Sequence, residues 1–272
     1  MYPRLFTTHL FNRELTLHTY GVLLALAFVV SLWVVGWLCR RARIDPAPLM
    51  DLAVYSLIGG LVGARLMLLA VDWRFYSSHP AELWSLLQSG GVFYGGLIGG
   101  LIVAAVYLWR HPIPGWPAAD ILAPAVAIGQ AIGRLGCLAA GCCFGKPAAG
   151  LAWAVTFRDM YANRQVGTPV DTPLHPSQVY ESIACALIFI VLVWMMPRKK
   201  FHGQVALAYI ALYSAVRFGL EYFRGDAARG KFGPLWTSQW VAVVLVLGVI
   251  ALVPYLLKRQ RIAPPAGDTA AA

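Results

Sequence analysis

The stretch IGGLVGARLMLLAV (58–71) contains a single charged residue, Arg65, in a sequence that otherwise reads as a membrane-spanning helix. Two further apolar stretches repeat the pattern, with Arg134 in AIGRLGC and Arg217 in YSAVRFGLEYF. A guanidinium in hydrocarbon costs at least about 2.5–3.5 kcal/mol even on lenient insertion scales, so it persists only beside an anionic partner or a wet cavity. The three arginines therefore predict a helical membrane protein with a site for an anion, and a lipid headgroup suits that site.

Composition supports the membrane assignment. The chain has 272 residues, of which 59% are hydrophobic and 12% charged, and its mean hydropathy is +0.65. An average soluble domain is far less apolar. Runs of roughly twenty apolar residues can each cross about 30 Å of hydrocarbon; they lie at 17–38, 49–71, 91–109, 118–138, 178–196, 203–223 and 236–257. We expect an all-α polytopic protein, a seven-transmembrane-helix bundle that forms one domain over residues 1–262. The first run lacks a small-residue cleavage site, which predicts a retained helix rather than a signal peptide.

Basic residues set the expected orientation. They follow the first, third, fifth and seventh runs: Arg40, Arg41, Arg43, Arg110, Arg198, Lys199, Lys200, Lys258, Arg259 and Arg261. The positive-inside rule places these flanks in the cytoplasm, which leaves the N-terminus outside and the C-terminus inside. We attribute the net charge of +10 to these topology signals and to anionic lipid, not to nucleic acid. Of the polar residues in the cytoplasmic half, Asp51 and Asp120 stand at expected helix starts, where a carboxylate complements the helix dipole.

Two connections and the C-terminus complete the expected organisation. Residues 139–177 form a long outer connection, expected to be a small extracytoplasmic cap, in which the alternation of LAWAVTFRD (151–159) hints at a short strand. The aromatic residues of loop 73–90 favour an interfacial belt or a short helix that lies flat on the membrane. The Pro/Ala-rich tail 263–272 is expected to be disordered.

Six separated segments then carry a resemblance to a known family. They are HTYG (18–21), GARL (63–66), YGGLIGG (94–100), GRLGCLAAGCCFG (133–145), HPSQVYES (175–182) and RFGLEYFRGD (217–226). In order and spacing they resemble the prolipoprotein diacylglyceryl transferase family over nearly the whole chain. The resemblance implies a multi-pass protein of the bacterial inner membrane. It also implies an enzyme that moves the diacylglyceryl group of phosphatidylglycerol to the thiol of the lipobox cysteine in a prolipoprotein signal peptide, releasing glycerol phosphate. No metal or soluble cofactor is expected.

Arginine is suited to the leaving phosphate because its planar fork of donors matches phosphate oxygens. Arg134 and Arg217 lie where the family carries its essential arginines and are the expected headgroup clamps. The resemblance also implies catalytic contacts for Tyr20 and His175. It further implies substrate contacts for Arg65, Glu221, His18, Gly95, Gly96 and Gly145.

Structural interpretations of these residues remain open beside the functional ones. Arg217 and Glu221 are four residues apart and could neutralise each other, or Glu221 could orient the guanidinium. Arg65 could form an interhelical ion pair, for example with Glu181. Tyr20 could be an interfacial tyrosine, and His175 a structural residue at a helix start that Ser177 caps.

Tyr94 is a departure from the family pattern. Well-studied members carry a histidine immediately before GGLIG, where it is a candidate for thiol deprotonation, and this chain has Tyr94. A phenol titrates near 10 rather than near 6.5, so it serves as a base only if nearby arginines stabilise the phenolate. The proton acceptor could be Tyr94, His175 or His18, or the arginines and the departing phosphate could activate the thiol.

The second departure is a cysteine cluster. Cys137 and Cys142 stand where typical members have asparagine and glutamate, and Cys143 follows. A disulfide, a zinc site with His175 as fourth ligand, and packed free thiols all remain open, although C-x4-C-C is not a standard zinc spacing. Cys39 and Cys185 are expected to be core residues.

Three other functions compete with the family activity. A paralogue could use the same lipid donor with a different acceptor. A lipid or anion transporter would require polar residues that continue to the cytoplasmic face. A thiol oxidoreductase would require a C-x-x-C motif or a quinone site, and the sequence shows neither.

Overall fold

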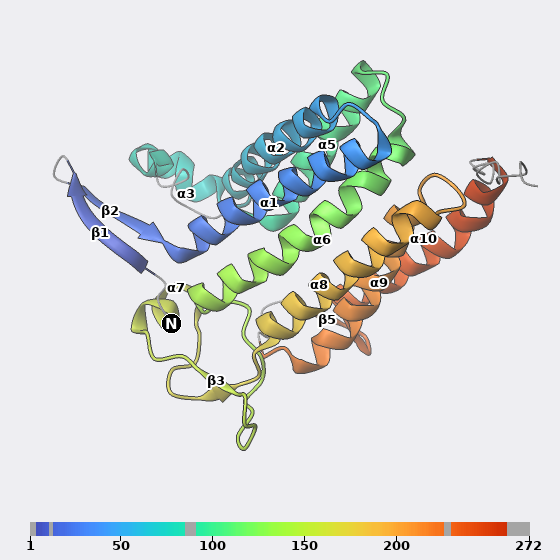
Figure 1. Cartoon of the computed structure of the whole chain (residues 1–272). Coiled ribbons are helices and arrows are strands. Elements are labelled where there is room, and N and C mark those ends of the chain that lie inside the picture. The colour runs from blue at the N-terminus through green and yellow to red at the C-terminus, as the bar shows by residue number, and fades with distance from the viewer. Residues whose placement is uncertain (1–3, 11–12, 85–90, 226–229, 260–272) are drawn as a thin grey trace, which may run out of the picture. The chain divides into compact units, whose positions relative to one another are not determined.

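The computed structural model describes residues 4–10, 13–84, 91–225 and 230–259, and the expected tail 263–272 lies outside this part. Long α-helices dominate the fold (Figure 1). The chain divides into a larger unit, Met1–Val34 with Ala119–Ala272, and a smaller unit, Val35–Ala118.

Two glycine-rich helices form the centre of the smaller unit. Helix α2 (Ala47–Val71) packs along helix α5 (Phe93–Arg110). A Cβ atom added to Gly63 would overlap the carbonyl oxygen of Gly95 and would lie 2.9 Å from the Cα atom of Gly99. The two backbones are thus in direct contact, as small residues allow between membrane helices.

Loop 73–90 of the smaller unit contains two short helices, α3 (Trp73–Ser78) and η1 (Pro80–Trp84). Trp73 and Phe75 are exposed, with 61% and 50% of their surface accessible. Residues 73–78 and 80–84 are thus helical, whereas their position at a membrane surface stays a prediction, and residues 85–90 lie outside the described part.

The larger unit begins with an antiparallel hairpin that the sequence analysis missed. Strands β1 (Arg4–Leu10) and β2 (Arg13–His18) pair before helix α1 (Thr19–Ala42) begins. The predicted first span, about 17–38, corresponds to α1, which begins two residues later because residues 17 and 18 belong to β2. Apolar and polar residues alternate in RELTLH, as is typical of a strand, but Leu15 and Leu17 also continue the apolar helix that follows.

Four long helices build the rest of this unit: α6 (Gly115–Ala140, from residue 119), α8 (Ser177–Met195), α9 (Gln204–Leu220) and α10 (Thr237–Arg259). Helix α9 packs against both α8 and α10 (Figure 1). The buried core joins α6, α8 and α9 through Ala123, Ala127, Ile188, Leu192, Val205 and Ala206. Short elements lie at the ends of these helices: η2 (Met196–Arg198), η3 (Glu221–Phe223), β5 (Lys231–Phe232) and β6 (Leu235–Trp236).

The connection between α6 and α8 folds around a small two-stranded sheet. Strand β3 (Val155–Thr156) pairs with β4 (Pro173–Leu174), and the short helix α7 (Met160–Val166) lies between them in sequence. The strand predicted within residues 151–159 is confirmed.

Asp120 fixes the start of helix α9. Its fully buried carboxylate accepts hydrogen bonds from the backbone N–H groups of Gly203, Val205 and Ala206 at 2.9–3.1 Å, and from Lys199 Nζ at 2.9 Å. The carboxylate therefore complements the N-terminus of α9 and not that of its own helix α6, which corrects the prediction from sequence.

Six of the described helices are long and apolar enough to cross a membrane; they cover 19–42, 47–71, 93–110, 115–140, 177–198 and 237–259. The remaining predicted span, 203–223, corresponds to α9. This helix has 17 residues, one fewer than the shortest of the six. Seven spans and the orientation derived from them stay predictions.

We predict that Gly63→Ala lowers the thermal midpoint of the detergent-solubilised protein, because the new methyl group forces α2 and α5 apart at a cost of about 1–3 kcal/mol. Gly248→Ala in α10 is the matched control, since a Cβ atom there meets nothing within 4 Å. Equal midpoints for the two variants would contradict the close packing of α2 on α5.

Candidate functional site

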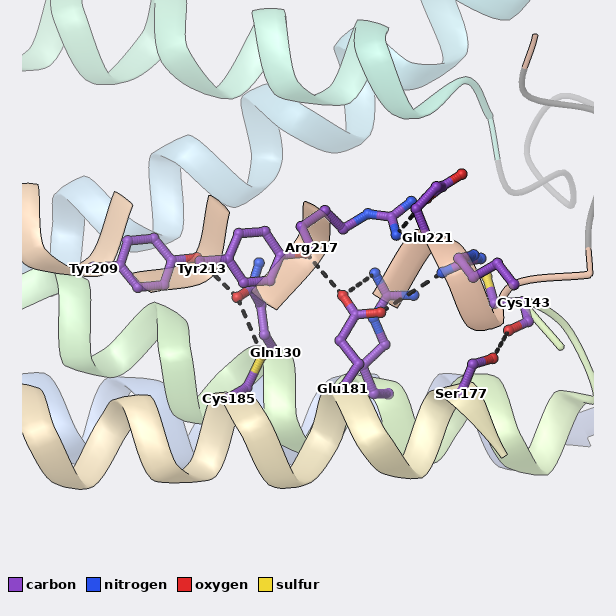
Figure 2. A network of polar contacts seen from close by, with 11 residues as sticks. Gln130, Cys143, Ser177, Glu181, Cys185, Tyr209, Tyr213, Arg217 and Glu221 are labelled. Atoms are coloured by element: carbon purple, nitrogen blue, oxygen red, sulfur yellow. Dashed lines mark hydrogen bonds and ion pairs between the residues drawn. The ribbon is translucent and has the colours of Figure 1, made fainter. Parts of the chain in front are cut away.

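The carboxylate of Glu181, on the first turns of α8, is the centre of a buried polar network (Figure 2). Oε1 lies 2.8 Å from Nη2 of Arg134 on α6 and accepts a 2.9 Å hydrogen bond from the Tyr213 hydroxyl on α9. Oε2 lies 3.7 Å from Nη1 of Arg224, which follows η3. One carboxylate thus joins three segments that are far apart in the sequence.

Helix α9 and η3 present a stripe of polar residues at intervals of four: Tyr209, Tyr213, Arg217 and Glu221. Residues four apart in the sequence lie about one turn apart on the same face of a helix, so the four side chains lie along one face. Arg217 Nη1 lies 2.8 Å from Glu221 Oε2, and only 12% and 3% of the two side chains are exposed. Tyr209 donates to Oε1 of Gln130 at 2.8 Å, which ties the stripe to α6 (Figure 2).

Guanidinium groups outnumber carboxylates in this network. Three guanidinium groups, those of Arg134, Arg217 and Arg224, are matched by the two carboxylates of Glu181 and Glu221. Both interpretations of the Arg217–Glu221 pair, neutralisation and orientation, agree with the observed distance.

The turn after α6 is held by side chains at three consecutive carbonyl groups. Thr168 Oγ1 donates to the carbonyl of Gly141, Gln178 Nε2 to that of Cys142, and Ser177 Oγ to that of Cys143, at 2.7–2.8 Å. Ser177 was expected to cap α8; this is wrong, because its hydroxyl bonds to the turn and no side chain caps the helix.

The turn also gathers three thiols. The sulfur atoms of Cys137, Cys142 and Cys143 lie within 4.8 Å of one another, and no disulfide joins any of the chain's five cysteines, all of which are described. The pKa of Cys143 is lowered, because the thiols of Cys137 and Cys142 donate hydrogen bonds to its thiolate and because Arg224 lies near. The pKa of Cys142 is raised, because its thiol donates hydrogen bonds to Cys137 and Cys143 and because it is partly buried.

Tyr20 lies close to this part of α6. A Cβ atom on Gly136 would be 3.3 Å from the Tyr20 ring, so the ring covers a backbone position two residues beyond Arg134. His18, at the end of β2, is paired in register with Arg4 of β1 and is exposed.

His175 and Gly145 meet at the base of the turn. The N–H group of Gly145 donates to the carbonyl of His175, and a Cβ atom on Gly145 would overlap His175 and lie 2.9 Å from the carbonyl oxygen of Phe223. The His175 ring lies with Nδ1 3.3 Å from the hydroxyl of Tyr180. Gly145 therefore permits a close approach of backbones, and His175 already has a polar partner.

The remaining predicted site residues belong to the smaller unit. Arg65 Nη1 donates to the carbonyl of Leu61 at 3.1 Å. Tyr94, at the start of α5, is 58% exposed and its ring packs edge-on against Phe93. Gly95 and Gly96 face α2 at Gly63 and Gly60. Gly95 and Gly96 thus lie in the contact between α2 and α5, and Tyr94 lies at an exposed helix start.

Sequence reasoning missed four members of the network: Arg224, Tyr213, Tyr209 and Gln130. It named Glu181 only as a possible partner of Arg65. Arg224 stood within the recognised segment 217–226, and the interval of four from Tyr213 to Arg217 was a usable signal. The position of Gln130, one turn before Arg134 on α6, was a further signal.

Comparison with known proteins agrees with the motif pattern. The sequence profile of the family described as prolipoprotein diacylglyceryl transferase matches residues 8–255. A protein of Symbiobacterium thermophilum named phosphatidylglycerol–prolipoprotein diacylglyceryl transferase is 32% identical over 257 residues, which cover 94% of this chain and 93% of the relative. Relatives of the same name from Thermosynechococcus vestitus and Clostridium tetani are each 30% identical. They cover 85% and 86% of this chain, and 85% and 92% of their own length.

We predict that Glu181→Gln destabilises the protein by about 3–5 kcal/mol, because it leaves the buried guanidiniums of Arg134 and Arg224 without their shared counter-charge. The measurement is the thermal midpoint in detergent. Asp171→Asn is the control, since Asp171 and Arg158 form a pair of 3.9 Å whose side chains are 77% and 85% exposed. A loss of stability no greater than that of the control would contradict the central position of Glu181.

Proposed function

The chain belongs to the prolipoprotein diacylglyceryl transferase family, and from this premise we propose that it transfers the diacylglyceryl group of phosphatidylglycerol to the lipobox cysteine of a prolipoprotein. The bond between the glyceryl carbon and the phosphate oxygen breaks, and a thioether bond forms between that carbon and the cysteine sulfur. Glycerol phosphate leaves with the electron pair of the broken bond, and the thiol proton passes to a base or to the leaving group.

The observation that carries this proposal is the pairing of Arg134 with the buried Glu181. A guanidinium held by a carboxylate at 2.8 Å cannot rotate freely, so the direction of its remaining N–H groups is fixed before substrate binds. Its side chain is 22% exposed, which leaves it accessible to a headgroup. Donors fixed in advance stabilise the charge that develops on a leaving phosphate without a cost of reorganisation.

Arg217 is the second proposed clamp. Glu221 holds its guanidinium at 2.8 Å, and Arg217 lies one helical turn from Tyr213, which donates to Glu181. The two arginines therefore belong to one connected network on α6, α8 and α9. In this role Glu221 orients Arg217, and Tyr20, near Gly136, contacts the headgroup or the acceptor.

The identity of the base remains a choice among Tyr94, His175 and His18. Nδ1 of His175 lies 3.3 Å from the Tyr180 hydroxyl. Tyr180 can thus orient His175 as a base, but the same contact fits a structural histidine equally well. Tyr94 is exposed at a helix start, where a phenol can reach a substrate. Arg65, His18, Gly95, Gly96 and Gly145 stay proposed substrate contacts by resemblance.

The proposed setting is the bacterial inner membrane, with seven spans, an outer N-terminus and an inner C-terminus. The six candidate spans make the chain multi-pass, and α9 packs between two neighbours, α8 and α10, that are themselves candidate spans. In this topology segment 139–177 is an extracytoplasmic cap.

The direct test combines purified protein, phosphatidylglycerol and a lipobox peptide, followed by mass spectrometry of the peptide. The expected product is the peptide carrying one diacylglyceryl group in a thioether. Absence of the adduct beside an active control enzyme would favour a paralogue with another acceptor.

We predict that Arg134→Lys and Arg217→Lys each lower turnover at least about a hundredfold, because lysine cannot restore a planar fork of donors to the phosphate. The measurement is the rate of adduct formation at saturating lipid. Arg158→Lys, at an exposed arginine outside the network, serves as the control and should keep its rate. Turnover near the wild-type value in either clamp variant would remove that arginine from the catalytic group.

We further predict that Tyr94→Phe strongly lowers transfer, because the hydroxyl that donates to phosphate or accepts the thiol proton is lost while the ring remains. Tyr94→His should retain activity with a pH optimum moved downward, since imidazole titrates several units below a phenol. The measurement is the pH–rate profile of both variants. If Tyr94→Phe transfers at the wild-type rate and Tyr94→His has the wild-type pH optimum, Tyr94 has no role in the chemistry, and His175 or His18 is left as the base.

A further inference from the structure

The three cysteines after α6 form a site that the proposed transfer does not use. Cys137 lies in the last turn of α6, and Cys142 and Cys143 lie in the turn that follows. Their sulfur atoms are within 4.8 Å of one another and half-buried. The spacing C-x4-C-C is not a standard zinc pattern. The argument for a metal ion comes instead from the short distances between the three sulfur atoms.

We propose that Cys137, Cys142 and Cys143 bind one Zn²⁺ ion through their three sulfur atoms, and that a water molecule or an external ligand completes the coordination. Zinc in proteins prefers sulfur or nitrogen ligands in a tetrahedral geometry, and sites with three protein ligands hold water or another small ligand in the fourth position. Around a zinc ion with bonds of about 2.3 Å, three sulfur atoms lie roughly 3.8 Å apart. The observed separations therefore require movements of about 1 Å or less.

The backbone that carries the thiols is fixed from outside the cluster. Thr168, Gln178 and Ser177 bind the carbonyl groups of Gly141, Cys142 and Cys143 at 2.7–2.8 Å. Cys143 has a φ angle of 60°, a left-handed conformation that is unfavourable for a residue other than glycine and persists only where its surroundings enforce it. In metal sites, hydrogen bonds of this kind hold the ligands in the orientation that binds the ion.

The electrostatic surroundings also suit the ion. Three thiolates would place three negative charges together, and one Zn²⁺ reduces them to a single net negative charge. Arg224 forms a side-chain hydrogen bond with Cys143 and is positioned to balance that charge. His175 does not join the cluster that the structure brings within coordinating distance, so the fourth ligand predicted from sequence is not part of the proposed set.

The test uses the full chain, purified with a reductant on a tag that contains no histidine, stripped with a chelator and then titrated with Co²⁺. Expected is one cobalt per chain with a sulfur-to-cobalt charge-transfer band that stoichiometric Zn²⁺ abolishes. Serine variants of Cys137, Cys142 and Cys143 should each bind at least about a hundredfold more weakly. Cys185→Ser should bind as the wild type does, because Cys185 is buried on α8 and its serine can keep the hydrogen bond to Gln130.

A second measurement on the wild type covers variants that fail to fold. Zn²⁺ should protect Cys137, Cys142 and Cys143 from alkylation by N-ethylmaleimide, mapped by mass spectrometry, while labelling of Cys39 and Cys185 stays unchanged. Absence of both the cobalt band and the protection in the reduced protein would overturn the proposal, and a disulfide recovered from the untreated protein would then explain the cluster. Neither measurement depends on transferase activity, so failure here and failure of the proposed function are separate results.

Discussion

The larger unit depends on a single constraint, the need to neutralise guanidinium groups inside an apolar helix bundle. Glu181 meets this need for Arg134 and Arg224 together, and it also accepts the Tyr213 hydroxyl. A buried ion pair contributes little net stability against an apolar alternative, but loss of one partner is costly. A functional role of the arginines therefore explains the arrangement better than the stability of the fold does. The same contacts fix the positions of α6, α8, α9 and the segment after η3 relative to one another.

Asp120 is a second buried carboxylate with positively polarised partners, and its role is structural. Its carboxylate is fully buried and satisfied by backbone N–H groups at the start of α9 and by Lys199. All of its hydrogen-bond partners are internal, whereas the Glu181 network includes a guanidinium that is 22% exposed. Two buried carboxylates thus serve different ends: Asp120 fixes where a helix begins, and Glu181 pairs with two guanidinium groups.

Much of the fold was predictable from the sequence because long apolar runs have one stable form in a membrane, the helix. Seven predicted runs match α1, α2, α5, α6, α8, α9 and α10, with ends shifted by a few residues. The hairpin before α1 was not predictable by that argument, since Leu15 and Leu17 fit a strand and the start of an apolar helix equally well. Of the three arginines that the sequence singled out, Arg134 and Arg217 lie in the polar network and Arg65 lies in the smaller unit. Arg224 was missed because nothing in a single sequence shows that a residue beyond a helix end contacts a carboxylate on another helix. Ser177 and Asp120 were misassigned for a related reason: a polar side chain at a helix end was expected to act on its own helix, and tertiary contacts supplied better partners.

The two departures from the family pattern affect different parts of the chemistry. Tyr94 belongs to the smaller unit and bears on the removal of the thiol proton. The cysteines belong to the larger unit: Cys137 lies on α6, as Arg134 does, and Cys142 and Cys143 lie in the turn after it. A change at the cysteines can reach Arg134 through Arg224, which contacts both Cys143 and Glu181. No such connection is needed for Tyr94, whose ring packs on Phe93 within its own helix. An altered charge at the cysteine cluster should thus change the binding of the lipid phosphate. An altered residue at position 94 should change the protonation of the acceptor thiol and therefore the pH dependence of the rate. The two substitutions can be distinguished because one affects lipid binding and the other the pH–rate profile.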